Sequence, residues 1–221
     1  MERKGSMSIQ VYTADGVFSA AQLRQIAEAS ERYGNGTARL MSARAVALPG
    51  VPEKQRAALA EELAAADLLT AMPEQSLRPV GFCRGLHCRH GQIDTQGLAA
   101  KIEERFLTAY KDAALPHKFR IAICGCANNC AKVDLCDIGI MGWQHGYKVY
   151  LGGMWGKKRR AGTASHDILH TEEEVLDLVG RALDLYQKEG RQRERFGDML
   201  ERLALADQSD ILAYAAAKEA D

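Results

Sequence analysis

The sequence predicts an α+β fold that is built from two parts. Stretches in which apolar and polar residues alternate are typical of strands, and they are interspersed with longer segments in which apolar residues recur at helical spacing. Residues 8–72 contain no cysteine, whereas all six cysteines lie between residues 83 and 136. With 221 residues, the chain is long enough for one large domain or two small ones.

Residues 8–72 are expected to form a strand–helix–strand–helix unit. Residues 9–12 alternate like a strand, and Ser19 is a favourable N-cap for the helix that follows. Residues 37–48 return to an extended pattern, and Pro52 lies in the first turn of a second helix. We expect the two helices to cover one face of the sheet, the first of them through Leu23, Ile26, Ala27 and Ser30.

The second predicted domain, residues 77–205, begins with the cysteine region. A helix is expected over about residues 95–110, after a loop that holds the first cysteine pair. Residues 119–123 predict a strand that leads directly to the second cysteine pair, and two more strands are expected at 137–141 and 147–151.

The C-terminal part of this domain is predicted to be helical. Thr171 and Glu174 have the spacing of a capping box, and an amphipathic helix follows them. A last helix carries Phe196, Leu200 and Leu203 on one side. Residues 206–221 are expected to form a peripheral tail.

The composition excludes several classes of protein. Twenty-nine basic and 29 acidic residues cancel, so no overall field attracts the chain to nucleic acid or to an anionic membrane. No segment approaches the roughly 20 apolar residues that span a bilayer, and the first residues lack the apolar core of a secretion signal. Clustered cysteines without an export signal are untypical of a disulfide framework. We therefore expect a reduced, cytoplasmic protein.

Two close cysteine pairs predict a metal centre. Cys83 and Cys88 are separated by four residues, and Cys126 and Cys130 by three. Four thiolates can hold zinc or an iron–sulfur cluster. Zinc sites more often have two residues between paired cysteines, so the looser spacing favours a larger iron–sulfur cubane. A structural zinc module and buried cysteines without a metal are the alternatives.

Basic residues gather around the same segment. Lys118 and Arg120 alternate on the strand before Cys126, so both are expected on one face of the sheet. Arg78 precedes Cys83 by five residues, and Arg44 lies in the extended part of the first unit. Guanidinium groups bind oxyanions and carboxylates through paired hydrogen bonds. The alternative for each of these residues is solvated surface charge.

A second cationic segment follows a glycine-rich turn. Such a turn allows the backbone to approach a ligand closely. A solvated loop is the alternative interpretation. The four cations of this segment are Lys157, Lys158, Arg159 and Arg160.

The second cysteine pair carries a more specific pattern. The stretch Gly125-Cys126-Ala127-Asn128-Asn129-Cys130 is followed, after six residues, by Asp137-Ile138-Gly139-Ile140. This pattern resembles a motif of the sirohaem-containing sulfite and nitrite reductases. The first unit is similar to the ferredoxin-like half-domain of these enzymes, and the resemblance covers residues 8–205. Full-length members contain two copies of this module, and this chain has a single copy. Further similar stretches are 88–95, 115–120, 146–153 and 190–197.

The resemblance implies two cofactors. A [4Fe–4S] cluster would be bound by Cys83, Cys88, Cys126 and Cys130, and Cys130 would also be the proximal ligand of the sirohaem iron. Asn129 and the four cations at 157–160 would contact the sirohaem and its carboxylates. Lys118 and Arg120 would hold the substrate's oxygens and help to deliver protons, with Arg44 and Arg78 as further candidates.

The implied activity is the six-electron reduction of sulfite to sulfide, of the assimilatory type. Reduction of nitrite to ammonia by the same centre is the alternative within the family. A non-catalytic iron–sulfur protein for electron transfer or redox sensing is the alternative from another class. No flavin or nicotinamide motif is recognised, so the resemblance implies an external, ferredoxin-like electron donor. It also implies a homo-oligomer or an unlike partner subunit where a second module completes the pocket.

Overall fold

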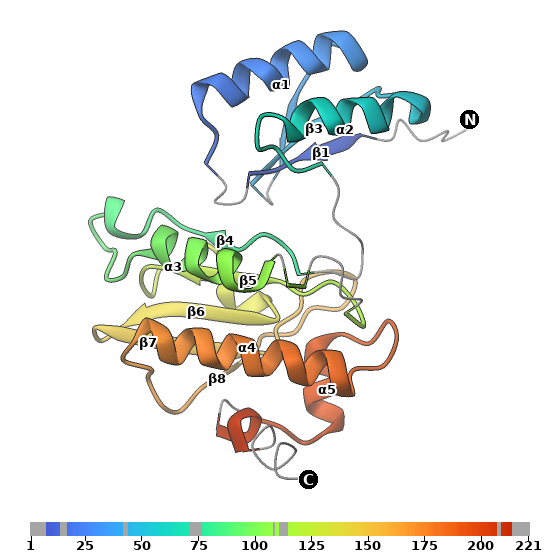
Figure 1. Cartoon of the computed structure of the whole chain (residues 1–221). Coiled ribbons are helices and arrows are strands. Elements are labelled where there is room, and N and C mark those ends of the chain that lie inside the picture. Colours follow the sequence, from blue (N-terminus) through green and yellow to red (C-terminus); the bar gives the residue numbers. More distant parts are fainter. Residues whose placement is uncertain are drawn as a thin grey trace. The chain divides into compact units, whose positions relative to one another are not determined.

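The computed structural model describes residues 8–13, 17–41, 44–70, 77–107, 109–110, 115–206 and 209–213. The chain divides into two compact units, Met1–Met72 and Pro73–Asp221 (Figure 1). The predicted boundary between residues 72 and 77 overlaps the segment 71–76, which lies outside the described residues.

The first unit is a three-stranded antiparallel sheet with two helices. The strand order is β1-β3-β2, and β2 and β3 together occupy the stretch predicted as a single extended segment. The elements are β1 (Ile9–Val11), α1 (Ala20–Tyr33), β2 (Arg39–Met41), β3 (Ala45–Leu48), a 3-10 turn (Glu53–Gln55) and α2 (Arg56–Ala64).

The core of the first unit lies on one face of this sheet. Ile9 is paired with Leu48 and Val11 with Val46, so these four side chains share a face. They belong to one buried cluster with residues of α1 and α2, among them Ile26, Leu59 and Leu63. The two helices therefore pack on the same face of the sheet, as predicted.

The buried face of α1 differs from the predicted one. Ser19 and Gln22 form a complete capping box, so the helix begins where the sequence indicates. Ile26, Ala29 and Ser30 are buried, whereas Leu23 is 49% exposed. The apolar face is thus centred between Ile26 and Ser30, because side chains three and four residues apart share a helix face.

The second unit is built around a five-stranded mixed sheet of order β4-β5-β6-β7-β8. Strands β4, β5 and β6 are parallel, and β6, β7 and β8 are antiparallel. The elements are β4 (Gly81–Phe82), α3 (Thr95–Ile102), β5 (Ile121–Cys124), β6 (Ile138–Trp143), β7 (Gly146–Leu151), β8 (Thr163–Ala164), α4 (Glu172–Glu189) and α5 (Phe196–Arg202).

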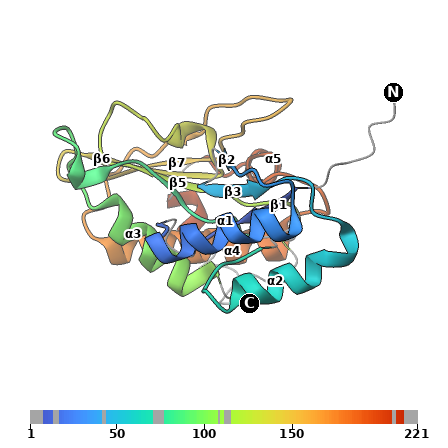
Figure 2. The ribbon, with the colours of Figure 1, turned by 90° about the horizontal axis from the view of Figure 1, so that it is seen from above.

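Helices cover one face of the second sheet. Figures 1 and 2 show α3 and α4 side by side on that face. Phe119 lies just before β5 and packs against Tyr186 of α4 and Phe196 of α5, with ring centroids 5.4 and 4.9 Å apart. All three rings are fully buried. Aromatic pairs of this kind stabilise a fold by about 0.5–1.5 kcal/mol each beyond the burial of their area.

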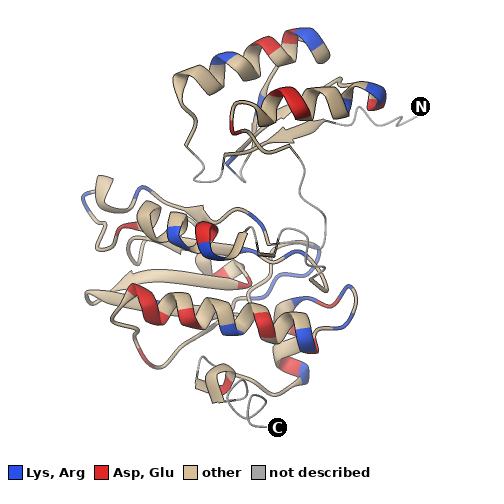
Figure 3. Ribbon diagram, viewed as in Figure 1, with Lys and Arg blue, Asp and Glu red and all other residues tan. Residues whose placement is uncertain are grey.

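The α4 helix is the longest element of the chain's described part and has the predicted start. Thr171 and Glu174 form the capping box, and three glutamates occupy the first turn. Negative charge near the N-terminus and Lys188 in the last turn both complement the helix dipole. Figure 3 shows acidic and basic positions along α4.

One predicted helix is shorter than expected, and the predicted tail is described only in part. The helix predicted over about residues 95–110 is α3, which begins after its N-cap Asp94 and continues as a π-helical turn, Glu103–Leu107. Residues 209–213 of the predicted tail are helical, with Ile211 fully buried, and most of 206–221 lies outside the described residues. None of the helices in the described residues is long and apolar enough to cross a membrane.

Candidate functional site

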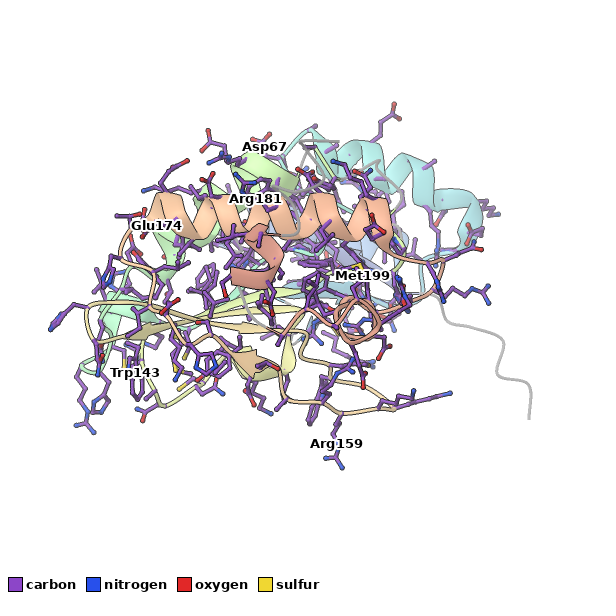
Figure 4. All side chains as sticks on the ribbon, turned by 90° about the horizontal axis from the view of Figure 1, so that it is seen from below. Asp67, Trp143, Arg159, Glu174, Arg181 and Met199 are labelled. Atoms are coloured by element: carbon purple, nitrogen blue, oxygen red, sulfur yellow. The ribbon has the colours of Figure 1, made fainter. Side chains whose placement is uncertain are left out.

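The face of the second sheet opposite α4 carries the sulfur-rich core, and we call it the cysteine face. Phe119 points to the helices, so alternation places Lys118, Arg120, Ala122 and Cys124 on the other side. Ala122 and Cys124 belong to a buried cluster on this side, whose other members are Val133, Cys136 and Met141. Figure 4 shows Trp143 and Arg159 on the side of the strands away from α4.

The two cysteine pairs meet at the carboxyl ends of β4 and β5. Cys83 directly follows β4, which runs parallel to β5, and its backbone N–H donates to the Ile123 carbonyl at 3.1 Å. The Gly125 N–H donates to the Cys83 sulfur at 3.1 Å, and the Gly85 N–H is 3.5 Å from the same sulfur. The residue before Cys126 thus contacts the first cysteine of the other pair directly.

The loop of the first pair depends on close backbone packing. The Gln92 N–H donates to the Gly125 carbonyl at 2.8 Å, so the two motifs are joined on both sides. A Cβ atom on Gly91 would lie 1.9 Å from the carbonyl oxygen of Gly85. Gly85 itself has a positive φ of 50°. Glycine is needed at these positions because no side chain can occupy the space between the two loop segments.

The loop around Cys130 is shaped by Asn129. Both Asn129 and Lys132 have left-handed backbone conformations, with φ of 51° and 52°. The Asn129 side chain accepts from the Val133 N–H at 2.8 Å and donates to an Asp134 carboxylate oxygen at 2.5 Å. These bonds hold the turn that leaves Cys130 exposed. The structure shows this supporting role, and the predicted contact of Asn129 with a cofactor stays a prediction.

Exposure divides the cysteines into two groups. The four predicted ligands are accessible, since Cys83, Cys88 and Cys126 are partly exposed and Cys130 is exposed. Cys124 and Cys136 are buried, and burial raises the pKa of both thiols, that of Cys136 to about 11. These two therefore remain protonated near neutral pH and behave as small apolar groups.

The accessible set fits an iron–sulfur cluster in its donor chemistry. Thiolates that accept backbone N–H bonds are the usual environment of such clusters. Within the described residues, no group of three or more His, Cys, Asp or Glu side chains is arranged to hold a metal ion. The assignment of Cys83, Cys88, Cys126 and Cys130 as ligands therefore remains a prediction.

Three of the predicted anion-binding residues occupy neighbouring backbone positions. Leu77 and Phe119 form a parallel bridge, and the Arg78 N–H donates to the Phe119 carbonyl at 2.9 Å. Leu77 and Phe119 are both fully buried. The alternation of side chains therefore places Arg78 beside Arg120 and Lys118, towards the cysteine face.

Arg44 belongs to the first unit. It directly precedes β3 and has a positive φ of 53°. Its predicted role in anion binding stays a prediction.

The cationic segment 157–160 is divided in the structure. Lys157, Lys158 and Arg159 are exposed, and the Arg159 guanidinium lies 5.9 Å from the centre of the Trp155 ring. Arg160 instead forms ion pairs with Asp198 and Glu201 at 2.7 and 2.8 Å. The Arg160 side chain thus connects the segment 157–160 to α5. The run of four cations in the sequence did not indicate this connection.

The sequence prediction also missed a buried ion pair. Asp137 is completely buried, and an Arg195 nitrogen lies 2.9 and 2.8 Å from its two carboxylate oxygens. The Arg120 backbone N–H donates to Asp137 at 2.9 Å. An acidic residue at the start of a strand of otherwise buried residues was the available signal, because buried carboxylates are almost always paired.

Sequence comparison matches two family models to the chain. A model of the "Nitrite and sulphite reductase 4Fe-4S domain" matches residues 75–208, which is more than half of the chain. A model of the "Nitrite/Sulfite reductase ferredoxin-like half domain" matches residues 1–66.

Three curated relatives are 26–28% identical to the chain over the aligned residues. "Nitrite reductase [NAD(P)H]" of Bacillus subtilis is 28% identical over 96% of this chain, which spans 26% of that protein. "Sulfite reductase, assimilatory-type" of Nitratidesulfovibrio vulgaris is 26% identical, with 87% of this chain and 86% of that protein covered. The chain spans 34% of the "Ferredoxin--nitrite reductase, chloroplastic" of Zea mays.

Solved structures have the same fold. Dissimilatory sulfite reductase I superposes with a TM-score of 0.81 at 14% identity, over 95% of this chain and 68% of that chain. The NirA protein of Mycobacterium tuberculosis gives 0.80 at 16% identity, over 96% of this chain and 40% of that chain. The predicted α+β architecture is confirmed. The chain belongs to the nitrite and sulphite reductase family, whose cofactors, a [4Fe–4S] cluster and sirohaem, are those predicted from its sequence.

Proposed function

We propose that the protein catalyses the six-electron reduction of sulfite to sulfide. One observation carries this proposal. The cations Arg78, Lys118 and Arg120 lie towards the same sheet face as the joined cysteine motifs, at the opposite end of β5 from Cys126. A cationic end suits an oxyanion, and the sulfur end suits an electron-supplying cluster.

The cluster ligands in this proposal are Cys83, Cys88, Cys126 and Cys130. Their accessibility supports the assignment, as does the N–H bond from Gly125 to the Cys83 sulfur. Cys130 is the most exposed of them, and we assign to it the second role of proximal sirohaem ligand. A thiolate that held both cofactors would give electrons a direct path from the cluster to the sirohaem.

The protein's own contribution is to hold the anion and supply protons. When bound, the sirohaem supplies the iron at which the anion is reduced, and the cluster supplies electrons. Lys118 Nζ and the Arg120 guanidinium bind the anion's oxygens, and Lys118 donates protons as these oxygens leave as water. Arg78, beside Arg120, adds a further donor, and Arg44 of the first unit is an additional candidate.

The sirohaem carboxylates require cations and polar donors. Lys157, Lys158 and Arg159 are exposed and suit this role, and Asn129 adjoins the proposed ligand Cys130. Arg160 would act indirectly, because its guanidinium is already bound to Asp198 and Glu201. It would fix the loop on which the other three cations are carried.

Sulfite is favoured as the substrate because one relative named a sulfite reductase aligns with this chain over most of the length of both proteins. The assimilatory-type sulfite reductase of N. vulgaris matches this chain over most of the length of both proteins. Nitrite is the second candidate, because several relatives that the chain matches over part of their length carry the name nitrite reductase. The same iron chemistry serves both anions.

The proposed reaction also suggests a cell compartment, an electron donor and a partner for the protein. All six cysteines are free thiols, which fits a reducing, cytoplasmic compartment. Electrons would come from a separate ferredoxin-like donor. A second copy of this chain or an unlike subunit would complete the pocket.

Turnover with both anions tests the proposed function. The anaerobically purified, sirohaem-loaded protein is assayed with sulfite and with nitrite, side by side, with one artificial electron donor. We expect sulfide from sulfite, with a higher kcat/KM than for nitrite. A higher kcat/KM for nitrite would assign the second candidate. Turnover of neither anion, with both cofactors present, would favour a non-catalytic electron-transfer or redox-sensing protein.

A further inference from the structure

The buried pair of Asp137 and Arg195 joins two segments that are far apart in the sequence. Asp137 directly precedes β6 and has no exposed surface, and the Arg195 side chain is 11% exposed. One Arg195 nitrogen contacts both oxygens of the carboxylate. Complete burial raises the pKa of the Asp137 carboxyl, and the Arg195 guanidinium opposes that rise. The residue before α5 is thus tied directly to the centre of the sheet.

Asp137 in turn holds the backbone of Arg120. One carboxylate oxygen accepts from the Arg120 N–H at 2.9 Å, and the Ile138 N–H donates to the Arg120 carbonyl at 3.2 Å. On the other side of the same segment, the Arg78 N–H donates to the Phe119 carbonyl at 2.9 Å. The segment just before β5 that carries Lys118 and Arg120 is therefore fixed from both sides.

Stability alone does not account for an ion pair at this position. Removing two charges from water is costly, and well-packed apolar residues of similar volume are often at least as stabilising as a buried pair. A buried carboxylate offers directional bonds that apolar side chains do not offer. Here one of those bonds ends on the backbone of a residue proposed to bind the substrate.

We infer that Asp137, held by Arg195, is a positioning residue that sets the location of Arg120 on the cysteine face. The inference rests on the proposed function, because it assigns the anion to Arg120. Its physical basis is that the backbone bond fixes the position of the Arg120 backbone, and so of its side chain, relative to β5, the strand that leads to Cys126. Displacements of about 1 Å at a distance from the chemistry can lower rates about 100-fold.

The experiment replaces the pair with apolar residues of similar size, Asp137→Leu with Arg195→Met, in the full chain loaded with both cofactors. This change removes the acceptor for the Arg120 N–H and leaves no unpaired buried charge. We expect kcat/KM for the reduced anion to fall about 10- to 100-fold, with the visible spectrum retained. Hydrogen exchange at the Arg120 amide should accelerate, while exchange in α4 stays unchanged.

A matched control is available beside the same ion pair, between the segment before α5 and α5 itself. Glu194 and Arg202 form a partly buried pair at 2.9 Å, and the hydrogen bonds of the Arg202 guanidinium to the Glu194 carboxylate and the Glu189 carbonyl end on residues other than Arg120. Glu194→Gln with Arg202→Gln should leave both kcat/KM and exchange at the Arg120 amide unchanged. An equal loss of kcat/KM in this control would overturn the inference.

A third comparison separates positioning from a general structural effect. In an Arg120→Ala background, the apolar pair should lower kcat/KM no further, because Asp137 acts through Arg120. A full additional loss there, or normal kcat/KM in the apolar pair alone, contradicts the inference.

Should the apolar pair fail to load cofactors, Asp137→Asn replaces it. Its amide oxygen can still accept from the Arg120 N–H, so kcat/KM and exchange at the Arg120 amide should stay near the unmodified values. A loss as large as that expected of the apolar pair would contradict positioning through this bond.

Failure of the proposed function gives a different result. If the unmodified protein reduced neither anion, the assignment of the anion to Arg120 would be wrong. Exchange at the Arg120 amide would still report whether Asp137 holds this backbone, since that measurement needs no turnover. Unchanged exchange in the apolar pair would contradict the positioning role by itself.

Discussion

At the scale of single residues, burial separates the six thiols by chemistry. Cys124 and Cys136 adjoin the cysteine motifs in sequence, but both are packed in the apolar cluster with Val133 and Met141. The remaining four are accessible to a ligand. The spacing of the two cysteine pairs had already left Cys124 and Cys136 outside the predicted ligand set, and their burial agrees with that prediction.

This division predicts opposite results for two substitutions. Cys130→Ser should lose the coupled cluster and sirohaem signal, since a hydroxyl is a poor replacement for the bridging thiolate. Cys136→Ala is the matched control and should retain iron, labile sulfide and the visible spectrum. Retention of the coupled signal in Cys130→Ser, measured in anaerobically purified protein, would remove Cys130 from the ligand set.

The proposed role of Lys118 is tested in the same way. Lys118→Ala should keep both cofactors but lower kcat by about 100- to 1,000-fold, as expected for removing one preorganised charge donor. Lys101→Ala is the control, because Lys101 is an exposed lysine on α3 that pairs with Glu172. Unchanged turnover in Lys118→Ala would show that Lys118 does not act on the substrate.

At the scale of elements, the glycine contacts of the first cysteine loop carry a sharp prediction. Gly91→Ala would place a Cβ atom 1.9 Å from the Gly85 carbonyl oxygen, so the loop must move. We expect this variant to lose most of its iron and labile sulfide. Gly156→Ala is the control, because nothing lies within 4 Å of a Cβ at that position. Equal iron content in the two variants would contradict the described loop.

The attachment of α5 predicts a dependence of stability on pH. Hydrogen bonds from Arg202 lower the pKa of the Glu194 carboxyl. A carboxyl with a lowered folded-state pKa stabilises the fold above its unfolded pKa of about 4.3, and this contribution is lost as the pH falls through the folded value. The free energy of unfolding should therefore fall more steeply below this pH than in Arg202→Gln. Lys188→Gln is the control and should show the same pH dependence as the unmodified protein. If the free energy of unfolding fell equally steeply in the unmodified protein, Arg202→Gln and Lys188→Gln, the pair of Glu194 and Arg202 would not cause this dependence.

Elements were more predictable than the faces that they bury. Capping boxes mark the starts of α1 and α4, and both lie where the sequence placed them. The buried side of α1 was misplaced because Leu23, an apolar residue, is half exposed. Helical spacing permits more than one apolar face, and only packing against the sheet selects between them.

At the scale of the whole molecule, the two-part α+β organisation and the family could be predicted because the cysteine motif is long and specific. The pairing of Asp137 with Arg195 could not, because 58 residues separate the partners. Nor could the binding of Arg160 to Asp198 and Glu201, since a run of cations does not show which member meets an acid in another element. Contacts between distant segments depend on the packing of α5 against the sheet.

The central claim is that this chain holds a cluster and a sirohaem on the cysteine face. The most direct test is the visible spectrum of the anaerobically purified protein, supplied with sirohaem and analysed for iron and labile sulfide. We predict sirohaem Soret and Q bands together with iron and sulfide in the proportions of one [4Fe–4S] cluster. A colourless protein that contains zinc, or a cluster without sirohaem bands, would contradict the account.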